Sequence, residues 1–356
     1  MKMSSQRRVD PQKLLLFCVE AMKGSGMREE DARVTADVLV DADLWGTFTH
    51  GTKSLYPYLQ KIQLNAIDPQ ASPEVLRESA AWAIIDGHAA MGMVTATVAM
   101  RLAIQKAKSV GIAYVGVKNG SHFGAAGCYA NMAAESQMIG LAMSNADPNM
   151  TVPGGNTSII GNNPLAVAIP AGVERTIILD IAMSAVAAGK ILAAKQLGTP
   201  IPSDWLVDAD GTPTADYSLW PKVGSMLPMG GYKGYGLALV IESLAAVMTG
   251  AGITTQVTSW SRNLSSRTNT GYAFVAIDVG AMMPIDEFKQ RMDSMIRAIR
   301  NSPKASWAKR IYLPGEMEWE KRDEALAHGI ALPQDVIQAL AQLAEEFNTD
   351  LSRIFV

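Results

Sequence analysis

The sequence is poor in cysteine. Only two of its 356 residues are cysteine, Cys18 and Cys128, which is too few for a disulfide framework. Cys18 stands in an apolar helical pattern, as a core thiol would. No apolar run of the signal-peptide type precedes Pro11. We therefore expect a protein of the reducing cytoplasm.

Long hydrophobic runs and blocks of one charge are also absent. The longest apolar stretch, Leu237–Met248, is interrupted by Glu242 and Ser243, and it is shorter than the roughly 20 residues that cross a bilayer. The net charge is −3, the pI is about 5.9, and no run of Lys and Arg exceeds two residues. These features argue against anionic membranes and nucleic acids as partners.

Several familiar site motifs are missing. The dinucleotide-binding pattern G-x-G-x-x-G does not occur, and its nearest candidate, Gly234-Tyr235-Gly236, lacks the third glycine. A P-loop fails because Ser184 and Ile191 stand where Gly and Ser/Thr are needed, and there is no G-x-S-x-G nucleophile elbow. The few histidines are not paired at zinc-binding spacings, so we expect no metal site. They are His50, His88, His122 and His328.

The apolar patterns predict an α/β protein whose sheet is flanked by helices from both chain ends. The segment Tyr235–Met248 is apolar nearly all round and must be buried in the core or in a subunit contact. The stretch Gly198–Pro228 is rich in Gly, Pro, Asp and Ser and is expected to be a long loop. Expected helices include Glu29–Leu44, Val94–Val110, Gly124–Gln137, Ser184–Leu197, Glu318–His328 and Asp335–Glu346; expected strands are Trp82–Asp86, Ile112–Val117, Ile139–Ser144, Leu165–Ile169, Ile177–Asp180 and Tyr272–Asp278.

Two histidines lie in glycine-flanked turns. His50, in Thr49-His50-Gly51, directly follows a predicted helix, and its imidazole could exchange a proton with a carbonyl oxygen or could only cap that helix. His122 lies between a predicted strand and a predicted helix, where ligands gather in α/β sheets. It too could be a plain helix cap.

A third polar segment is Met229–Gly236, in which Lys233 lies among glycines. Its ammonium could meet a phosphate or carboxylate, or could simply be solvated. Asp or Asn also occurs where three predicted strands end or begin, at Asn145 and Asp147, at 162–163, and at Asp180. Each is ordinary turn chemistry alone, but together they predict one polar rim.

Together these segments resemble the malate/L-lactate dehydrogenase-like family of oxidoreductases. The resemblance covers most of the chain. Within the family, this chain is most similar to the ureidoglycolate dehydrogenase branch, in the position of Tyr58 and in Ala188-Gly189-Lys190. The motifs that carry it are Thr49-His50-Gly51, Asp86-Gly87, Gly120-Ser121-His122, Asp147-Pro148, Gly161-Asn162-Asn163-Pro164, Asp180-Ile181-Ala182, Asp210–Thr214, Lys233–Gly236 and Leu313-Pro314-Gly315-Glu316.

The resemblance implies a non-Rossmann NAD(P)-binding α/β domain over 81–299 and a helical domain formed by 1–80 with 300–356. It further implies a homodimer with its active site near the subunit contact. The cofactor would be NAD or NADP, with NAD slightly favoured. The residues that the resemblance assigns to the cofactor are His122, Asp147, Asp180, Ile181, Ala182, Lys233, Gly234, Pro314, Gly315 and Glu316.

The activity implied is hydride transfer between nicotinamide and a small 2-oxo/2-hydroxy acid of ureidoglycolate, malate or lactate type, with His50 or His122 as the acid/base. Thr49, Lys53 and Tyr58 would bind substrate. Relatives carry an arginine four residues after the His50 position, where it can hold a carboxylate, and Ala146 stands where the ureidoglycolate branch has serine.

This chain has Ser54 at the arginine position, with Lys53 as a possible substitute. Two alternatives stay open. One is a ketimine reductase that acts on a cyclic or N-alkyl imino acid, and the other is a catalytically degenerate ligand-binding dimer.

Overall fold

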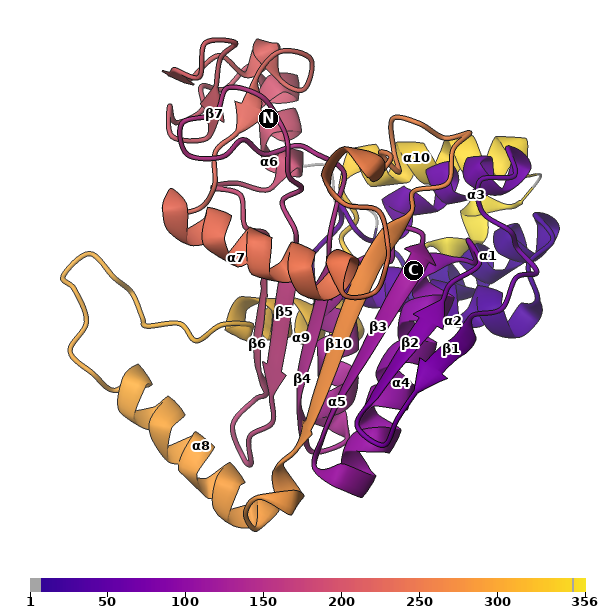
Figure 1. The fold of residues 1–356 in the computed structure, drawn as a ribbon. Coiled ribbons are helices and arrows are strands. Elements are labelled where there is room, and N and C mark those ends of the chain that lie inside the picture. The colour runs from indigo at the N-terminus through magenta and orange to yellow at the C-terminus, as the bar shows by residue number, and fades with distance from the viewer. Residues whose placement is uncertain (1–7, 348) are drawn as a thin grey trace.

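The computed structural model describes residues 8–347 and 349–356 and is built around a seven-stranded sheet (Figure 1). The strands of this sheet are β1 (Glu74–Glu78), β2 (Trp82–Asp86), β3 (Ile112–Gly120), β4 (Met138–Ser144), β5 (Leu165–Ile169), β6 (Ile177–Ile181) and β10 (Thr270–Asp278). The helices are α1 (Pro11–Gly24), α2 (Glu29–Leu44), α3 (Leu55–Gln63), α4 (Gly92–Val110), α5 (Ala126–Glu135), α6 (Ala188–Leu197), α7 (Tyr232–Glu242), α8 (Ile285–Arg300), α9 (Glu316–His328) and α10 (Gln334–Glu346).

The sheet has the order β1-β2-β3-β10-β4-β5-β6. Only β2 and β3 run parallel, and every other neighbouring pair is antiparallel. The α/β class predicted from the sequence is confirmed. The edge strand β1 was not predicted because all five of its residues are exposed and show no alternation of apolar and polar side chains.

Helices cover both faces of the sheet. Helices α4 and α5 pack on one face, while α7 and a π-helical stretch, Ser243–Val247, lie across the other (Figure 1). The contact of α5 with β4 is close, since a Cβ on Gly140 would lie 2.3 Å from the carbonyl oxygen of Ala130. Glycine and alanine at this contact therefore let the helix backbone approach the strand.

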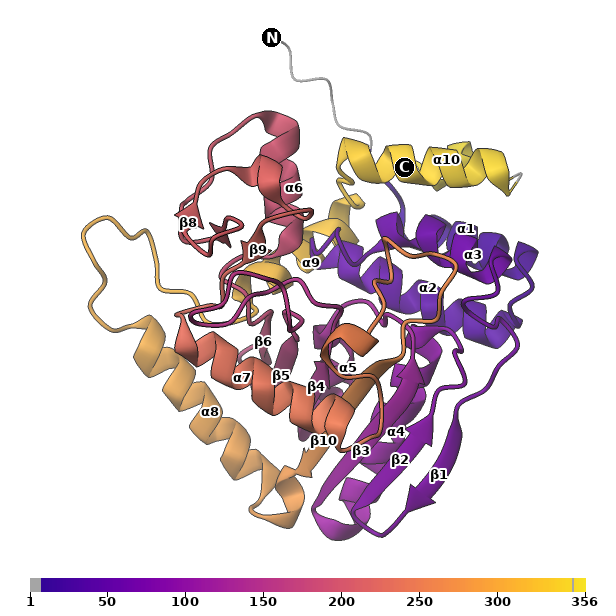
Figure 2. The same cartoon turned by 45° about the horizontal axis from the view of Figure 1, so that its top comes forward.

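The two ends of the chain meet beside the sheet. The backbone of Val9 bridges to Ile330 and Phe355, and helices α1, α2 and α3 gather with α9 and α10 (Figure 2). One continuous apolar cluster runs from these helices into the sheet. Helices were thus correctly expected at both ends, and the domain boundary near residue 80 stays a prediction.

The predicted long loop 198–228 contains a small three-stranded sheet, which corrects that expectation. Its strands are β7 (Leu206–Val207), β8 (Pro213–Thr214) and β9 (Ser225–Met226). Two-residue strands are too short to show a periodic pattern. Helix α6 begins at Ala188, four residues later than predicted, and packs with this small sheet around its own apolar cluster.

The apolar segment predicted over Tyr235–Met248 is not buried all round. Ala238 and Ile241 of α7 face the sheet and are buried. On the other side Val240 is 53% and Val247 62% exposed. Exposed aliphatic side chains that form a contiguous patch are typical of interaction surfaces.

Candidate active site

The polar residues predicted from strand ends gather at one edge of the sheet. Strands β3 and β4 both run antiparallel to β10, so both end where β10 begins. Strand β6 also ends at this edge, because Ile181 pairs with Leu165 at the start of β5. His122, Asp147 and Asp180 therefore belong to segments that reach a single edge of the sheet.

The structure brings the two candidate histidines together. His50 lies in the connection between α2 and α3, and His122 follows β3. Their rings stack with centroids 5.7 Å apart and an interplanar angle of 28°. The hydroxyl of Thr49 lies 3.0 Å from Nδ1 of His50. Both imidazoles are half-buried and keep Nε2 without a hydrogen bond to any described residue.

Tyr58 is part of the same arrangement. Its side chain is fully buried in α3, and its hydroxyl is hydrogen-bonded to Nδ1 of His122. Trp260 stacks on the same imidazole, with ring centroids 4.1 Å apart and an interplanar angle of 12°. The orientation of His122 is thereby determined from two sides, and its Nε2 is the nitrogen left for a substrate atom.

Burial changes the acidity of the imidazoles. Loss of solvation lowers the pKa of His50, and it lowers the pKa of His122 further because a charge on neighbouring His50 would repel a second one. Both rings are thus neutral near pH 7. A neutral imidazole is the form that accepts a proton when a hydroxy acid is oxidised.

A buried aspartate packs against the turn that follows His50. Asp43, at the end of α2, accepts hydrogen bonds from the backbone N–H of Thr52 at 3.1 Å and from its hydroxyl. A Cβ on Gly51 would lie 1.8 Å from Oδ1 of Asp43, so only glycine fits here. Burial raises the pKa of Asp43 to about 7. The carboxylate therefore ties the His50 turn to helix α2.

The predicted substrate lysine has another partner. The ammonium of Lys53 lies 2.6 Å from a carboxylate oxygen of Asp335 in α10. Ser54, at the family's arginine position, is buried and donates its hydroxyl to the carbonyl of Thr49 at 3.2 Å. Ser54 thus supports the His50 turn instead of presenting a charge.

Two predicted cofactor segments meet at the end of β6. Asp180 accepts a hydrogen bond of 2.7 Å from the N–H of Gly127 at the start of α5, and the residue remains exposed to solvent. Ile181 and Ala182 follow it and are half-buried. A Cβ on Gly234 would lie 2.7 Å from the carbonyl oxygen of Met183, so the start of α7 packs on this strand end. Lys233 beside it is exposed.

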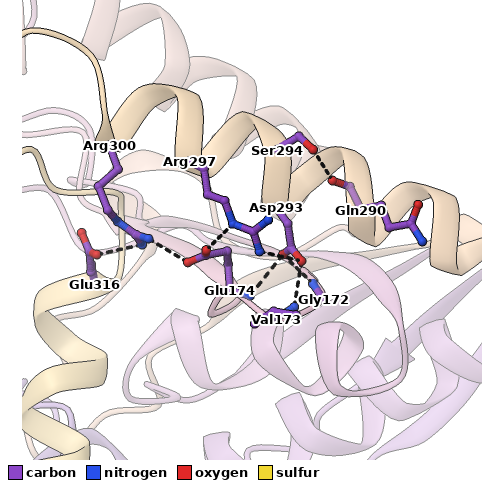
Figure 3. A network of polar contacts seen from close by, with 9 residues as sticks. All are labelled: Gly172, Val173, Glu174, Gln290, Asp293, Ser294, Arg297, Arg300 and Glu316. Carbon is purple, nitrogen blue, oxygen red and sulfur yellow. Dashed lines mark hydrogen bonds and ion pairs between the residues drawn. The ribbon is translucent and has the colours of Figure 1, made fainter.

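The third cofactor segment, Pro314-Gly315-Glu316, lies against the start of β6. The carbonyl of Pro314 accepts the N–H of Ile178 at 3.1 Å. Gly315 has φ +85° and packs closely on the same residue, since an added Cβ would lie 2.9 Å from the carbonyl oxygen of Ile178. The carboxylate of Glu316 accepts the N–H of Leu313 at 2.9 Å and pairs with Arg300 at 3.1 Å (Figure 3). The segment is therefore held in place before α9 begins.

Helix α8 is tied to the turn between β5 and β6 by the rest of the same network. Asp293 accepts hydrogen bonds of 2.8–3.1 Å from the three successive N–H groups of residues 172–174. Glu174 in that turn receives Arg297 and Arg300 of α8 (Figure 3). Three N–H groups stabilise the charged form and lower the pKa of Asp293.

Two asparagines of the predicted rim turn inward. The side-chain amides of Asn145 and Asn163 donate to Glu242 of α7 at 3.3 Å and 2.8 Å. Glu242 is buried and also accepts the N–H of Thr254 at 2.8 Å. These asparagines therefore hold α7 against the sheet, because a buried carboxylate needs such donors.

Sequence reasoning missed four residues of this region, namely Asp43, Lys61, Trp260 and Arg262. An aspartate in an apolar helix face just before a glycine-rich turn was the one available signal. The other three residues are linked to the site only through tertiary contacts. In the described part of the chain no cluster of His, Cys, Asp and Glu could hold a metal ion, and no helix is long and apolar enough to span a membrane.

Comparison with known proteins finds matches over most of the chain. A family model described as malate/L-lactate dehydrogenase matches residues 9–341. The L-sulfolactate dehydrogenase of Methanocaldococcus jannaschii is 38% identical over 333 residues, 94% of this chain and 95% of that protein. A malate dehydrogenase of Pyrococcus horikoshii is 34% identical over 354 residues, 96% of each chain.

The same likeness appears in a more distant relative and in a solved structure. A ureidoglycolate dehydrogenase (NAD(+)) of Escherichia coli K12 is 32% identical over 317 residues, 89% of this chain and 90% of that protein. The solved sulfolactate dehydrogenase of M. jannaschii superimposes with a TM-score of 0.91 at 36% identity, over 98% of this chain and 99% of that one.

Proposed function

This chain belongs to the malate/L-lactate dehydrogenase family and is an oxidoreductase of small 2-hydroxy acids, and from that premise we propose its residue roles, cofactor and assembly. The observation that carries the roles is the stacked pair of His50 and His122 at the edge of the sheet. The substrate would be an acid of malate, sulfolactate, lactate or ureidoglycolate type, with C2 near the imidazoles.

We assign the acid/base role to His122. Its partner Tyr58 is fully buried, whereas Thr49, the partner of His50, is exposed. A hydroxyl that cannot exchange with water orients the imidazole better. Protonated His122 would donate a proton from Nε2 to the 2-oxo oxygen during reduction, and neutral His122 would accept it during oxidation, while Nε2 of His50 would donate a second hydrogen bond to the same oxygen.

The cofactor proposed is NAD. When bound, nicotinamide donates or accepts the hydride. The residues fit such a group, because Asp180 keeps an accessible carboxylate for ribose hydroxyls, and Lys233 lies at the exposed start of α7, where a pyrophosphate is favoured. Arg300, near Glu316, is already engaged by two carboxylates, which disfavours its use for a 2′-phosphate. A lower KM for NADH than for NADPH is expected.

The fold fits a non-Rossmann cofactor domain over 81–299 with a helical domain of 1–80 and 300–356. A Rossmann unit needs neighbouring parallel strands, and this sheet has one parallel pair. Cys18 and Cys128 are free thiols, which supports a cytoplasmic location. Fractionation of the expressing cell would test that location.

We also propose a homodimer. The outer face of α7 and the following turn exposes Tyr232, Val240, Val247 and Met248. The segment 301–312 extends away from the rest of the molecule in both views (Figures 1 and 2) and carries Trp307, which is 87% exposed. Apolar surfaces of this kind are usually covered in an assembly. Light scattering after size exclusion should give twice the mass of the 38.1 kDa chain.

The activity test follows NADH and NADPH oxidation with pyruvate, oxaloacetate, sulfopyruvate and oxalurate, each with and without methylamine. Turnover without amine is expected, whereas turnover that needs amine would indicate an imine reductase. His122→Ala should lower kcat at least about 100-fold, and His50→Ala less. His328→Ala, an exposed control at the end of α9, should match the wild type. If both site variants keep wild-type turnover, the proposed roles are wrong.

A further inference from the structure

One loop brings a cation to the edge of the sheet where the histidines lie. Residues 258–268 connect the end of the α7 region to β10, and the neck of the loop is closed by a hydrogen bond of 3.0 Å from the N–H of Thr258 to the carbonyl of Thr268. The loop places Trp260 on the ring of His122. Any side chain next to Trp260 is therefore close to the reacting region.

The loop is also anchored from below. Lys61 of α3 is 1% exposed, and its ammonium donates to the carbonyls of Asn263 and Ser266 at 3.0 Å and 2.7 Å. Tyr58, one turn earlier in α3, is the residue bonded to His122. One helix thus positions both the imidazole and the loop that covers it, and the loop backbone is ordered before any ligand arrives.

Arg262 is two residues beyond Trp260 in this loop. Its Nη2 lies 2.7 Å from Oδ2 of Asp147, which follows β4, and its Nε donates to the hydroxyl of Ser259 at 3.2 Å. Since β3 and β4 end on either side of β10, the guanidinium lies along the same edge as His122. Two of its five N–H groups are used, and Nη1 has no hydrogen bond to any described residue.

The other cations of this region are less suited. Lys53 is paired with Asp335, and Lys61 is buried under the loop. Lys190 in α6 follows Gly189, which approaches the His50 turn so closely that an added Cβ would lie 2.7 Å from Cγ2 of Thr49. The side chain of Lys190 itself is exposed. Only a guanidinium offers two parallel N–H groups that match the geometry of a carboxylate.

We infer that Arg262 binds the carboxylate of the 2-oxo/2-hydroxy acid through the Nη1 side of its guanidinium, while Asp147 and Ser259 hold that guanidinium in orientation. Arg262 is then the residue that makes the enzyme select acids. This inference rests on the proposed function, and it adds a specificity residue that lies outside the His50 turn.

The test compares a 2-oxo acid that the wild type reduces with its neutral primary amide. Arg262→Met should raise the KM for the acid about 100-fold, the effect of removing one partner of a charged hydrogen-bonded pair, with a small change in kcat because the interaction is lost equally before and during hydride transfer. The kinetic constants for the amide should not change. Added guanidinium ion should restore acid turnover to Arg262→Ala, which a merely disturbed loop would not show.

Three matched variants complete the design. Arg267→Met removes an exposed arginine of the same loop, and Lys53→Met and Lys190→Met remove the neighbouring cations. All three should keep the preference for the acid. If Arg262→Met keeps that preference, or either lysine variant loses it, the inference is wrong while the proposed function stands. If the wild type reduces none of the acids, both are overturned.

Discussion

Asp43→Asn tests whether the carboxylate behind the His50 turn is as buried as the structure indicates. Burial raises the pKa of Asp43 from 3.8 to about 7. Between these two values the folded protein binds a proton that the unfolded chain has released, so the free energy of unfolding falls by about 1.4 kcal/mol per pH unit. Over about three pH units the free energy of unfolding falls by about 4 kcal/mol. This fall is complete once the pH exceeds the pKa of Asp43 in the folded protein.

Asparagine removes this penalty and keeps the geometry. Its carbonyl oxygen can still accept both hydrogen bonds from Thr52, and its amide takes the place of Oδ1, which has no partner among the described residues. Relative to the wild type, the variant should therefore gain about 4 kcal/mol between about pH 4 and pH 8. The two proteins share all other titrating groups, so the contributions of those groups cancel in the difference between the two free energies of unfolding.

Urea unfolding at several pH values and one protein concentration measures the effect, with the concentration held constant because the proposed dimer would otherwise alter apparent stability. Asp204→Asn, at an exposed aspartate just before β7, is the control and should unfold like the wild type. A difference between wild type and Asp43→Asn that is constant with pH, or that favours the wild type as pH rises, would refute the reasoning.

Three further predictions follow from single contacts. Gly51→Ala should destabilise the fold by about 3 kcal/mol, because the added Cβ would lie 1.8 Å from Asp43. Gly236→Ala is the control, since its Cβ would meet no atom within 4 Å. Thermal melting of the two variants measures the difference. Since burial holds the pKa of His122 well below 6.5, the kcat/KM for hydroxy-acid oxidation should stay level down to pH 6.5, and a pH profile that already falls there would contradict the assignment. Asp293→Ala should cost about 3 kcal/mol in urea unfolding because three N–H groups lose their acceptor, whereas the exposed Asp286→Ala in the same helix should cost little.

Much of the secondary structure could be predicted from the sequence, because it depends on local patterns. Trp82–Asp86 and Leu165–Ile169 are strands with the predicted bounds. The apolar runs of these strands are short and are bounded by polar or turn residues, which is enough to define a strand. The exposed strand β1 and the two-residue strands β7, β8 and β9 show no alternation of apolar and polar residues, and the prediction therefore missed them.

The candidate site divides in a similar way. Glycine-flanked turns marked His50 and His122 as candidates, since ligand-binding turns need both polarity and close backbone approach, and the structure stacks their two rings. The sequence could not show that asparagines of the same rim, such as Asn145, turn inward to Glu242. Both kinds of residue look alike in a turn.

The sequence by itself determined most of the elements, the family resemblance and the two candidate imidazoles, because each of these is encoded in residue types and short spacings. Only the tertiary structure decided which distant side chains meet. The pairing of β3 and β4 with β10 places His122 and Asp147 at the same edge of the sheet, and α3 holds the loop of Trp260 and Arg262 there. Sheet register and burial set these contacts, and neither is visible in local periodicity.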